Sequence, residues 1–198
     1  MSRISELPLE KWDPEMRQLF QSDHGDMSQY QASAILAHAP HMAKADVAFS
    51  RFAMEGKKLP SRLLELVRLR LAFHNQCRSC MAMRFQAAVD DGLTEELVCS
   101  LEKPMEAPNL SEREKAALEY ADAFAINHFA ITDETYDKLR SQFTEPEIVE
   151  LGVFIGFFFG LGRLFATWDC TERLPKVYQD KSTKAAPWKA PGEIVLVG

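Results

Sequence analysis

The chain has 198 residues, of which 46% are hydrophobic and 26% are charged, and its formal net charge is −6 at pH 7. That length fits one domain, and this balance of hydrophobic and charged residues excludes a wholly disordered chain. The negative charge argues against nucleic acid or an anionic membrane as a partner, because both would repel the protein.

The first residues, Met1–Glu6, lack the apolar run of a signal peptide. Four cysteines are too few for a disulfide scaffold in a chain of this size. We therefore expect a cytoplasmic protein whose cysteines rest in the reduced state. In that setting a close cysteine pair indicates catalysis, redox sensing or metal binding.

Signals for helix starts recur along the chain, and strand patterns are almost absent. The expected starts are Asp13-Pro14, Pro40, Ser61, Cys77, Thr94, Ser111 and Thr144. The helix that begins at Cys77 should continue to Asp91, because Gly92 is a typical stop. Only Ile194–Val197 looks like a strand. The pattern predicts an all-α, single-domain helical bundle.

We expect three segments in this bundle. They are an N-terminal helical extension (1–29), a helical domain (30–172) and an extended C-terminal arm (173–198). The apolar tip of the arm could dock on its own chain or on a neighbouring subunit, and a frayed terminus is the alternative.

The central domain contains a degenerate internal repeat. Glu65 precedes Cys77 by twelve residues, and Glu150 precedes Gly162 by twelve. If the repeat is real, two similar helical hairpins pack together and only the first carries thiols. Chance similarity between two apolar helices is the alternative.

The segment Leu151–Gly162 has no charged residue. It is shorter than the roughly 20 residues that a membrane-spanning helix needs, so we expect a buried core helix. Gly152, Gly156 and Gly160 share one face of it. Because each glycine weakens a helix by about 1 kcal/mol, this spacing predicts close approach of another backbone, in the core or across a subunit interface.

The pair Cys77 and Cys80 is the most informative feature. His74–Gln76 interrupts the preceding apolar pattern, so Cys77 should begin a new helix. In a continuous helix Arg84 would share an arc of about 60° with both cysteines. Unpaired amides of the first turn and the cations Arg78 and Arg84 would favour a reactive thiolate.

Two other interpretations of the pair remain open. A C-x-x-C spacing also arises from ordinary buried cysteines. Zinc is a sharper alternative, because His74, Cys77 and Cys80 supply three possible ligands. Structural zinc normally needs four ligands, and no second Cys/His cluster follows at suitable spacing, so we expect neither a metal nor a cofactor.

Glu65 interrupts an otherwise apolar helical run. It could face solvent and pair with Arg62 or Arg68 on its own helix. Alternatively, its carboxylate faces the thiols. A simple hairpin would then place Glu65 beside Arg84, which predicts an ion pair next to Cys80.

This region resembles alkyl hydroperoxidase D and the carboxymuconolactone decarboxylase-like proteins. Their motif is a glutamate, eleven residues, then C-x-x-C-x-x-x-H, and Glu65, Cys77 and Cys80 stand at the matching positions. The resemblance extends over roughly residues 30–170. Its flanks are His38–His41, Leu59–Val67, Asp91–Glu96, Leu110–Asp122 and the apolar block after Glu147.

The resemblance implies an all-α fold that usually assembles as a homo-oligomer. In the hydroperoxidase branch Cys80 would attack a peroxide, Cys77 would resolve the product into a disulfide, and Glu65 would relay protons. The implied partners are a peroxide or other small oxidant and a dithiol protein or small thiol. Neither nucleic acid nor a membrane is expected.

The chain departs from the family motif at the relay histidine. Arg84 stands in its place, and Ser79 stands where a second histidine often lies. Arginine stays protonated and cannot act as a general base. His74 could compensate, with a role in the loop or core as the alternative.

We therefore expect an enzyme, a thiol-dependent peroxidase or disulfide oxidoreductase that uses the Cys77–Cys80 pair. A non-enzymatic redox-sensing or scaffold protein of the same fold is the second hypothesis, motivated by the missing histidine. A carboxymuconolactone decarboxylase-like lyase is the third, although decarboxylation needs no dithiol.

Overall fold

The structure is a computed structural model that describes all residues except 1, 23–24, 56–57, 190–194 and 198. The α-helices of the described residues are α1 (Pro14–Phe20), α2 (Gln31–Leu36), α3 (Pro40–Glu55), α4 (Ser61–Asn75), α5 (Arg78–Ala82), α6 (Gln86–Asp90), α7 (Glu95–Cys99), α8 (Glu112–Ile126), α9 (Asp133–Arg140), α10 (Glu145–Trp168) and α11 (Lys176–Gln179). The strands are β1 (Gln21–Ser22), β2 (Gly25–Asp26), β3 (Met83–Phe85) and β4 (Val195–Val197). Short 3-10 helices include η3 (Ser100–Glu102) and η6 (Pro187–Lys189). The all-α, single-domain fold is confirmed.

Local sequence signals fix several helix starts as predicted. The Asp13 carboxylate accepts a hydrogen bond from the backbone in the first turn of α1. Ser111 with Glu114, and Thr144 with Glu147, form reciprocal capping boxes at α8 and α10. Each box satisfies backbone N–H groups that have no partner within the helix, which sets where the helix begins.

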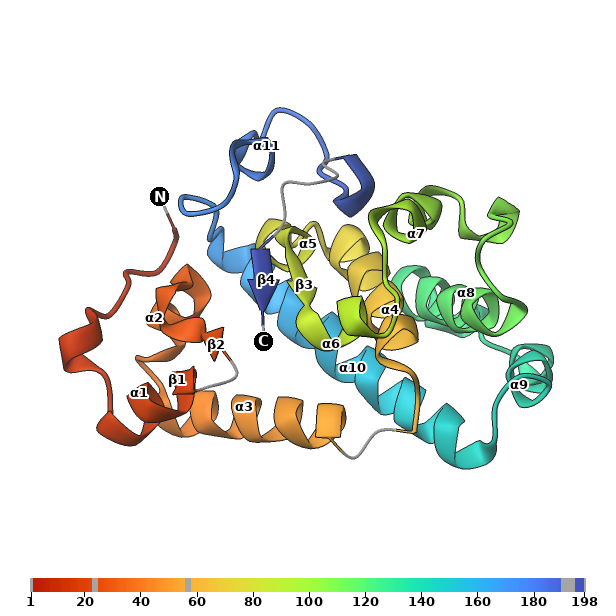
Figure 1. Ribbon diagram of the computed structural model, residues 1–198, viewed down its shortest axis with the longest axis horizontal. Coiled ribbons are helices and arrows are strands. Elements are labelled where there is room, and N and C mark those ends of the chain that lie inside the picture. The colour runs from red at the N-terminus through yellow and green to blue at the C-terminus, as the bar shows by residue number, and fades with distance from the viewer. Residues whose placement is uncertain (1, 23–24, 56–57, 190–194, 198) are drawn as a thin grey trace.

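The helices α4, α8 and α10 lie together at the centre of the molecule (Figure 1). Their facing apolar side chains form the main core, to which α7 also contributes. The helices α1, α2 and α3 form a second, smaller apolar cluster on one side. The segment boundaries after residues 29 and 172 stay predictions.

The expectation that Leu151–Gly162 is a fully buried helix is wrong for one of its faces. The helix continues past Glu150 and Arg163, so α10 has 24 residues, long and apolar enough by length and composition to cross a membrane. One face packs on α4 and α8, but only 28% of its most apolar window is buried. Because α10 is a central helix of this fold, it does not indicate a membrane protein.

The opposite face of α10 is an exposed apolar seam. It consists of Val149, Val153, Gly156, Gly160 and Leu164. A Cβ atom added at Gly156 or Gly160 would meet nothing within 4 Å. Within the described residues these two glycines therefore lack the predicted backbone contact, and contact across a subunit interface stays a prediction.

The two halves of the expected repeat do pack together, as α4 against α10. Their courses differ, however. The chain turns after Asn75 to begin α5, whereas α10 passes Gly162 without a break. The second half therefore lacks the turn that a matching hairpin would need.

The helix predicted from Cys77 to Asp91 is interrupted. The chain forms α5, then β3, then α6, and β3 pairs in parallel with β4 near the C-terminus. Arg84 lies in β3, so it does not share a helical face with Cys77 and Cys80. The apolar tip of the arm docks on its own chain, which was one of the expected alternatives.

Candidate redox site at the Cys77–Cys80 pair

A tight turn delivers the cysteines to the end of α4. Gln76 adopts left-handed backbone geometry (φ 52°), and the Cys77 N–H donates to the Ala72 carbonyl at 3.0 Å. This is a typical way to end an α-helix. Cys77 then caps α5, and its Sγ accepts a hydrogen bond from the Cys80 N–H at 3.4 Å. The new helix therefore begins where the sequence predicted.

Cys77 and Cys80 are joined in a disulfide. Cys77 is fully buried, whereas Cys80 is half-buried and packs beside the apolar cluster of Met81, Ala82 and Tyr178. Cys80 is therefore the more exposed cysteine of the pair in the single chain.

Glu65 pairs with Arg68 rather than with Arg84. Two bonds of 2.6 Å join the carboxylate to the Arg68 guanidinium, and both side chains are almost inaccessible to solvent. The expected pairing of Glu65 on its own helix is therefore found, but in the interior. The predicted Glu65–Arg84 ion pair is wrong, because Arg68 occupies the carboxylate.

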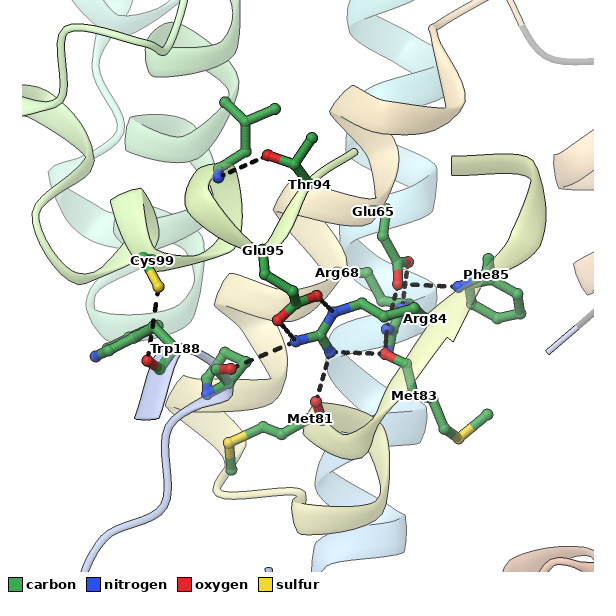
Figure 2. A network of polar contacts seen from close by, with 12 residues as sticks. Glu65, Arg68, Met81, Met83, Arg84, Phe85, Thr94, Glu95, Cys99 and Trp188 are labelled. Atoms are coloured by element: carbon green, nitrogen blue, oxygen red, sulfur yellow. Dashed lines mark hydrogen bonds and ion pairs between the residues drawn. The ribbon is translucent and has the colours of Figure 1, made fainter. Parts of the chain in front are cut away.

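This buried ion pair also explains why α5 is short. Arg68 donates to the carbonyl of Cys80 at 2.7 Å. It also donates to the carbonyl of Met83 at 2.8 Å, and Glu65 accepts from the Phe85 N–H at 3.2 Å (Figure 2). A continuous helix would need the Cys80 carbonyl and the Phe85 N–H for its own hydrogen bonds. Because the pair takes both groups, the helix ends at Ala82.

Arg84 is fully buried and all of its donors point away from the sulfurs. It forms an ion pair with Glu95 of α7, with its Nε 3.0 Å from the carboxylate. It also donates to the carbonyls of Met81 at 2.7 Å and Met83 at 3.0 Å (Figure 2). Its Nη2 donates at 3.4 Å to Pro187 of the arm. Arg84 is thus a structural connector between β3, α7 and the arm.

Arg78 is likewise engaged with the arm. Its guanidinium donates to the carbonyls of Asp180 at 2.5 Å and Thr183 at 2.7 Å. The Gln76 amide exchanges two hydrogen bonds with the backbone of Ala185, at 3.1 and 3.2 Å. The segment that carries the cysteines therefore also anchors the arm.

His74 points towards α8. Its Nε2 lies 2.6 Å from the Asp122 carboxylate, which Arg70 also grips through two nitrogens. Burial raises the pKa of Asp122, but the hydrogen bonds from His74 and Arg70 outweigh burial and hold that pKa below its usual value. This contact gives His74 a structural role in the core, and its use as a substitute proton relay stays a prediction.

Gly162 of α10 and Asn75 at the end of α4 lie close together beside the disulfide. A Cβ atom added at Gly162 of α10 would lie 3.8 Å from Cys80 Sγ and 3.1 Å from the Asn75 amide nitrogen. The Asn75 amide oxygen accepts a hydrogen bond from Arg163 Nε at 3.1 Å. The expected repeat marked Gly162, but no local pattern could show that this residue lies against Cys80 or that Asn75 and Arg163 bond to each other there.

The zinc hypothesis needs His74 and both cysteines to converge. In the part of the chain that the structure describes, no group of three His, Cys, Asp or Glu side chains could hold a metal ion. Instead the two sulfurs are bonded to each other and His74 is bonded to Asp122.

The chain is similar in sequence to one described family and to several uncharacterized proteins. Residues 40–123 match the model of the carboxymuconolactone decarboxylase family. An uncharacterized Mycobacterium tuberculosis protein is 39% identical over 87 residues, which are 44% of this chain and 31% of that protein. YdfG of Bacillus subtilis, also uncharacterized, is 32% identical over 92 residues, 46% of this chain and 63% of YdfG. The match thus spans about a third of the mycobacterial relative.

Solved structures share the fold over more of the chain. A protein of unknown function from Agrobacterium tumefaciens, related in its description to the antioxidant defence protein AhpD, is 25% identical, with a TM-score of 0.62 over 71% of this chain and 96% of its own. A peroxidase-related protein with an AhpD core from Ralstonia eutropha is 17% identical, with a TM-score of 0.72 over 90% and 94%. A debrominase bound to 2,3,4-tribromopyrrole is 16% identical, with a TM-score of 0.71 over 96% and 95%. The last two show the fold alone.

Proposed function

Since the chain belongs to the carboxymuconolactone decarboxylase and alkyl hydroperoxidase D-like superfamily, we propose that it is a thiol-dependent peroxidase or disulfide oxidoreductase. The observation that carries the proposal is the Cys77–Cys80 disulfide, which shows that the two sulfurs are within bonding reach. We also place the protein in the cytoplasm, because a reducing compartment returns such a disulfide to the dithiol.

In the first step the Cys80 thiolate attacks the terminal oxygen of a hydroperoxide. The O–O bond breaks, the S–O bond forms, and the released alkoxide takes a proton to leave as an alcohol, so that Cys80 becomes a sulfenic acid. The partial exposure of Cys80 and the burial of Cys77 support this division of roles.

In the second step the Cys77 thiolate attacks the sulfenic sulfur. A disulfide forms, and the hydroxide that leaves takes a proton from solvent to become water. One thiolate of an external dithiol then attacks the Cys80 sulfur, Cys77 leaves as a thiolate, and a mixed disulfide forms. The second thiolate of the dithiol attacks its own sulfur in that mixed disulfide, Cys80 leaves as a thiolate, and the external dithiol becomes a disulfide. The Cys80 N–H that donates to Cys77 Sγ favours that thiolate, because a hydrogen bond to the charged form lowers a pKa.

The proton transfers need a route other than the family relay. Glu65 is held by Arg68 and by the Phe85 N–H, and Arg84 cannot accept a proton. We therefore propose that water at the half-exposed Cys80 carries the protons, which gives slower turnover than a histidine relay would.

The test is peroxide consumption in the presence of an external dithiol. Wild type should turn over, Cys80→Ser should show no thiol-dependent activity, and Cys77→Ser should react once and stop. Equal activity in the three proteins would refute the proposal.

A redox sensor without turnover is the second candidate, favoured by the engagement of Glu65 with Arg68 and by arginine at the relay histidine position. Its mark is a disulfide that forms and is reduced reversibly, as measured by thiol titration, while peroxide loss stays stoichiometric with protein. Continued loss over many equivalents excludes it.

We further propose that the protein is a homo-oligomer and that the α10 seam (Val149, Val153, Gly156, Gly160 and Leu164) is a contact between subunits. Val149 and Val153 expose 64% and 52% of their surface, and the two glycines leave room for another backbone. Sedimentation velocity should show an oligomer in the wild type and a smaller species for Gly160→Glu. A monomeric wild type would exclude this contact.

A further inference from the structure

One exposed guanidinium belongs to the residue that directly follows the α10 residue packed against the Cys80 sulfur. Arg163 follows Gly162, the residue of α10 that packs against Cys80 Sγ. Its side chain is exposed, and only its Nε is used, in the bond to Asn75. Among the described residues, neither terminal nitrogen of Arg163 has a hydrogen-bond partner. A positive charge with two unengaged nitrogens is therefore carried by the residue that follows Gly162, and it is bonded to Asn75, which also lies close to Gly162.

Arg163 is also held in place. Its guanidinium carbon lies 4.1 Å from the centre of the Phe159 ring, and Asn75 accepts from Nε. The Asn75 amide is itself fixed, because its nitrogen donates to the Phe159 carbonyl at 2.8 Å. A guanidinium that is stacked and hydrogen-bonded on one edge loses little freedom when its other edge binds a ligand.

The chemistry of this group points to a carboxylate. The free edge of a guanidinium presents two parallel N–H donors that match the two oxygens of a carboxylate.

We propose that Arg163 binds a carboxylate on the molecule that approaches Cys80, so that the substrates are short hydroperoxides with an acidic group. This proposal extends the proposed peroxidase function, and the identification of these hydroperoxides as substrates rests on that function. The receptor itself does not depend on turnover, because any carboxylate-bearing reagent that reaches the reduced Cys80 should be recruited in the same way.

The receptor can be tested by alkylation without any peroxide. Reduced protein is treated with 3-maleimidopropionate or with its methyl ester, in a Cys99→Ala background because Cys99 is an exposed free thiol. The Cys80 thiolate adds to the maleimide double bond, and water supplies the proton. The ratio of acid to ester rates at Cys80, read by peptide mass spectrometry, cancels any change in thiolate fraction.

Arg163→Gln should lower this ratio about three- to tenfold, as expected for loss of a charge-assisted bidentate contact at an exposed site. Arg163→Lys should give a ratio between these two values, because lysine keeps the positive charge but lacks the two parallel N–H donors of the guanidinium. Arg140→Gln on α9 removes an equal charge from another exposed arginine and should leave the ratio unchanged. Equal ratios in wild type and Arg163→Gln would overturn the proposal.

Turnover then tests the substrate class separately. With 4-hydroperoxy-4-methylpentanoate, Arg163→Gln should raise KM about three- to tenfold with kcat within twofold, and the methyl ester should show no such change. An altered alkylation ratio without any peroxide turnover would retain the carboxylate receptor and reject the peroxidase. An equal rise in KM for acid and ester would reject the substrate class.

Discussion

The two central helices, α4 and α10, lie side by side and carry a glutamate at corresponding positions, but they use it differently. Glu65 of α4 is buried and paired with Arg68, and together they end the neighbouring helix α5. Glu150 of α10 instead accepts bonds from the Lys58 and Leu59 backbone at the surface. The difference shows that the redox site depends on interior polar contacts. Helix α10 instead packs one face against this site and leaves its opposite face exposed.

The largest expected effect comes from breaking the interior ion pair. Arg68→Met leaves the Glu65 carboxylate buried and unpaired, and should lower the free energy of unfolding by about 3–5 kcal/mol. Urea unfolding monitored by circular dichroism measures this. The double variant Glu65→Gln/Arg68→Met removes the stranded charge and should recover part of the loss. Additive losses in the double variant would mean that the two side chains are not coupled.

A second prediction concerns the wall that α10 presents to Cys80. Gly162→Val places methyl groups where a Cβ alone lies 3.1 Å from Asn75 and 3.8 Å from the sulfur. Overpacking should cost about 1–3 kcal/mol of unfolding free energy and slow the reaction of Cys80 with the neutral maleimide ester. Ala166→Val, at a partly exposed position of the same helix outside the seam, is the control for β-branching in α10. Equal maleimide rates in the two variants would contradict the packing of Gly162 against Cys80.

The smallest effect is expected at the start of α10. The Thr144 backbone N–H and then Arg113 hold the pKa of Glu147 at about 2, below its usual value. A lowered carboxyl pKa stabilises the fold above the unfolded-state pKa of roughly 4.3 and loses that effect as pH falls towards 2. Glu147→Gln should therefore cost about 1 kcal/mol at pH 7 and nothing at pH 2, after allowance for solvent screening.

That pH profile is measured by urea unfolding of both proteins at several pH values. A constant difference between wild type and Glu147→Gln across the whole range would show that the capping box does not depend on the ionised carboxylate.

The contrast between local and distant contacts also explains how far sequence reasoning reached. The caps at Ser111 and Thr144 and the helix start at Cys77 were predictable, because each depends on residues within one turn. The end of α5 was not, because Arg68 and Glu65 on another helix take its backbone groups. The spacing of Glu65 and Arg68 did suggest a pair, but spacing alone does not tell a surface pair from a buried one.

The position of the Arg84 side chain was also not predictable, because it depends on distant contacts. Its match to the relay histidine position suggested a place beside the thiols, yet its partner Glu95 lies on α7. The family motif gives the order of residues and cannot give the direction of a substituted side chain. The glycine spacing did indicate a special face of α10, with a subunit interface as one alternative. The exposure of that face was not predictable, because twelve uncharged residues look alike whether one face or all faces are buried.

The central claim is that Cys80 is the sulfur that reacts with peroxide. The direct measurement is to treat reduced Cys77→Ser with one equivalent of hydroperoxide, trap sulfenic acid with dimedone, and locate the adduct by peptide mass spectrometry. The account predicts the adduct on Cys80. An adduct confined to Cys99 or Cys170, or no adduct while peroxide is still consumed, would contradict it.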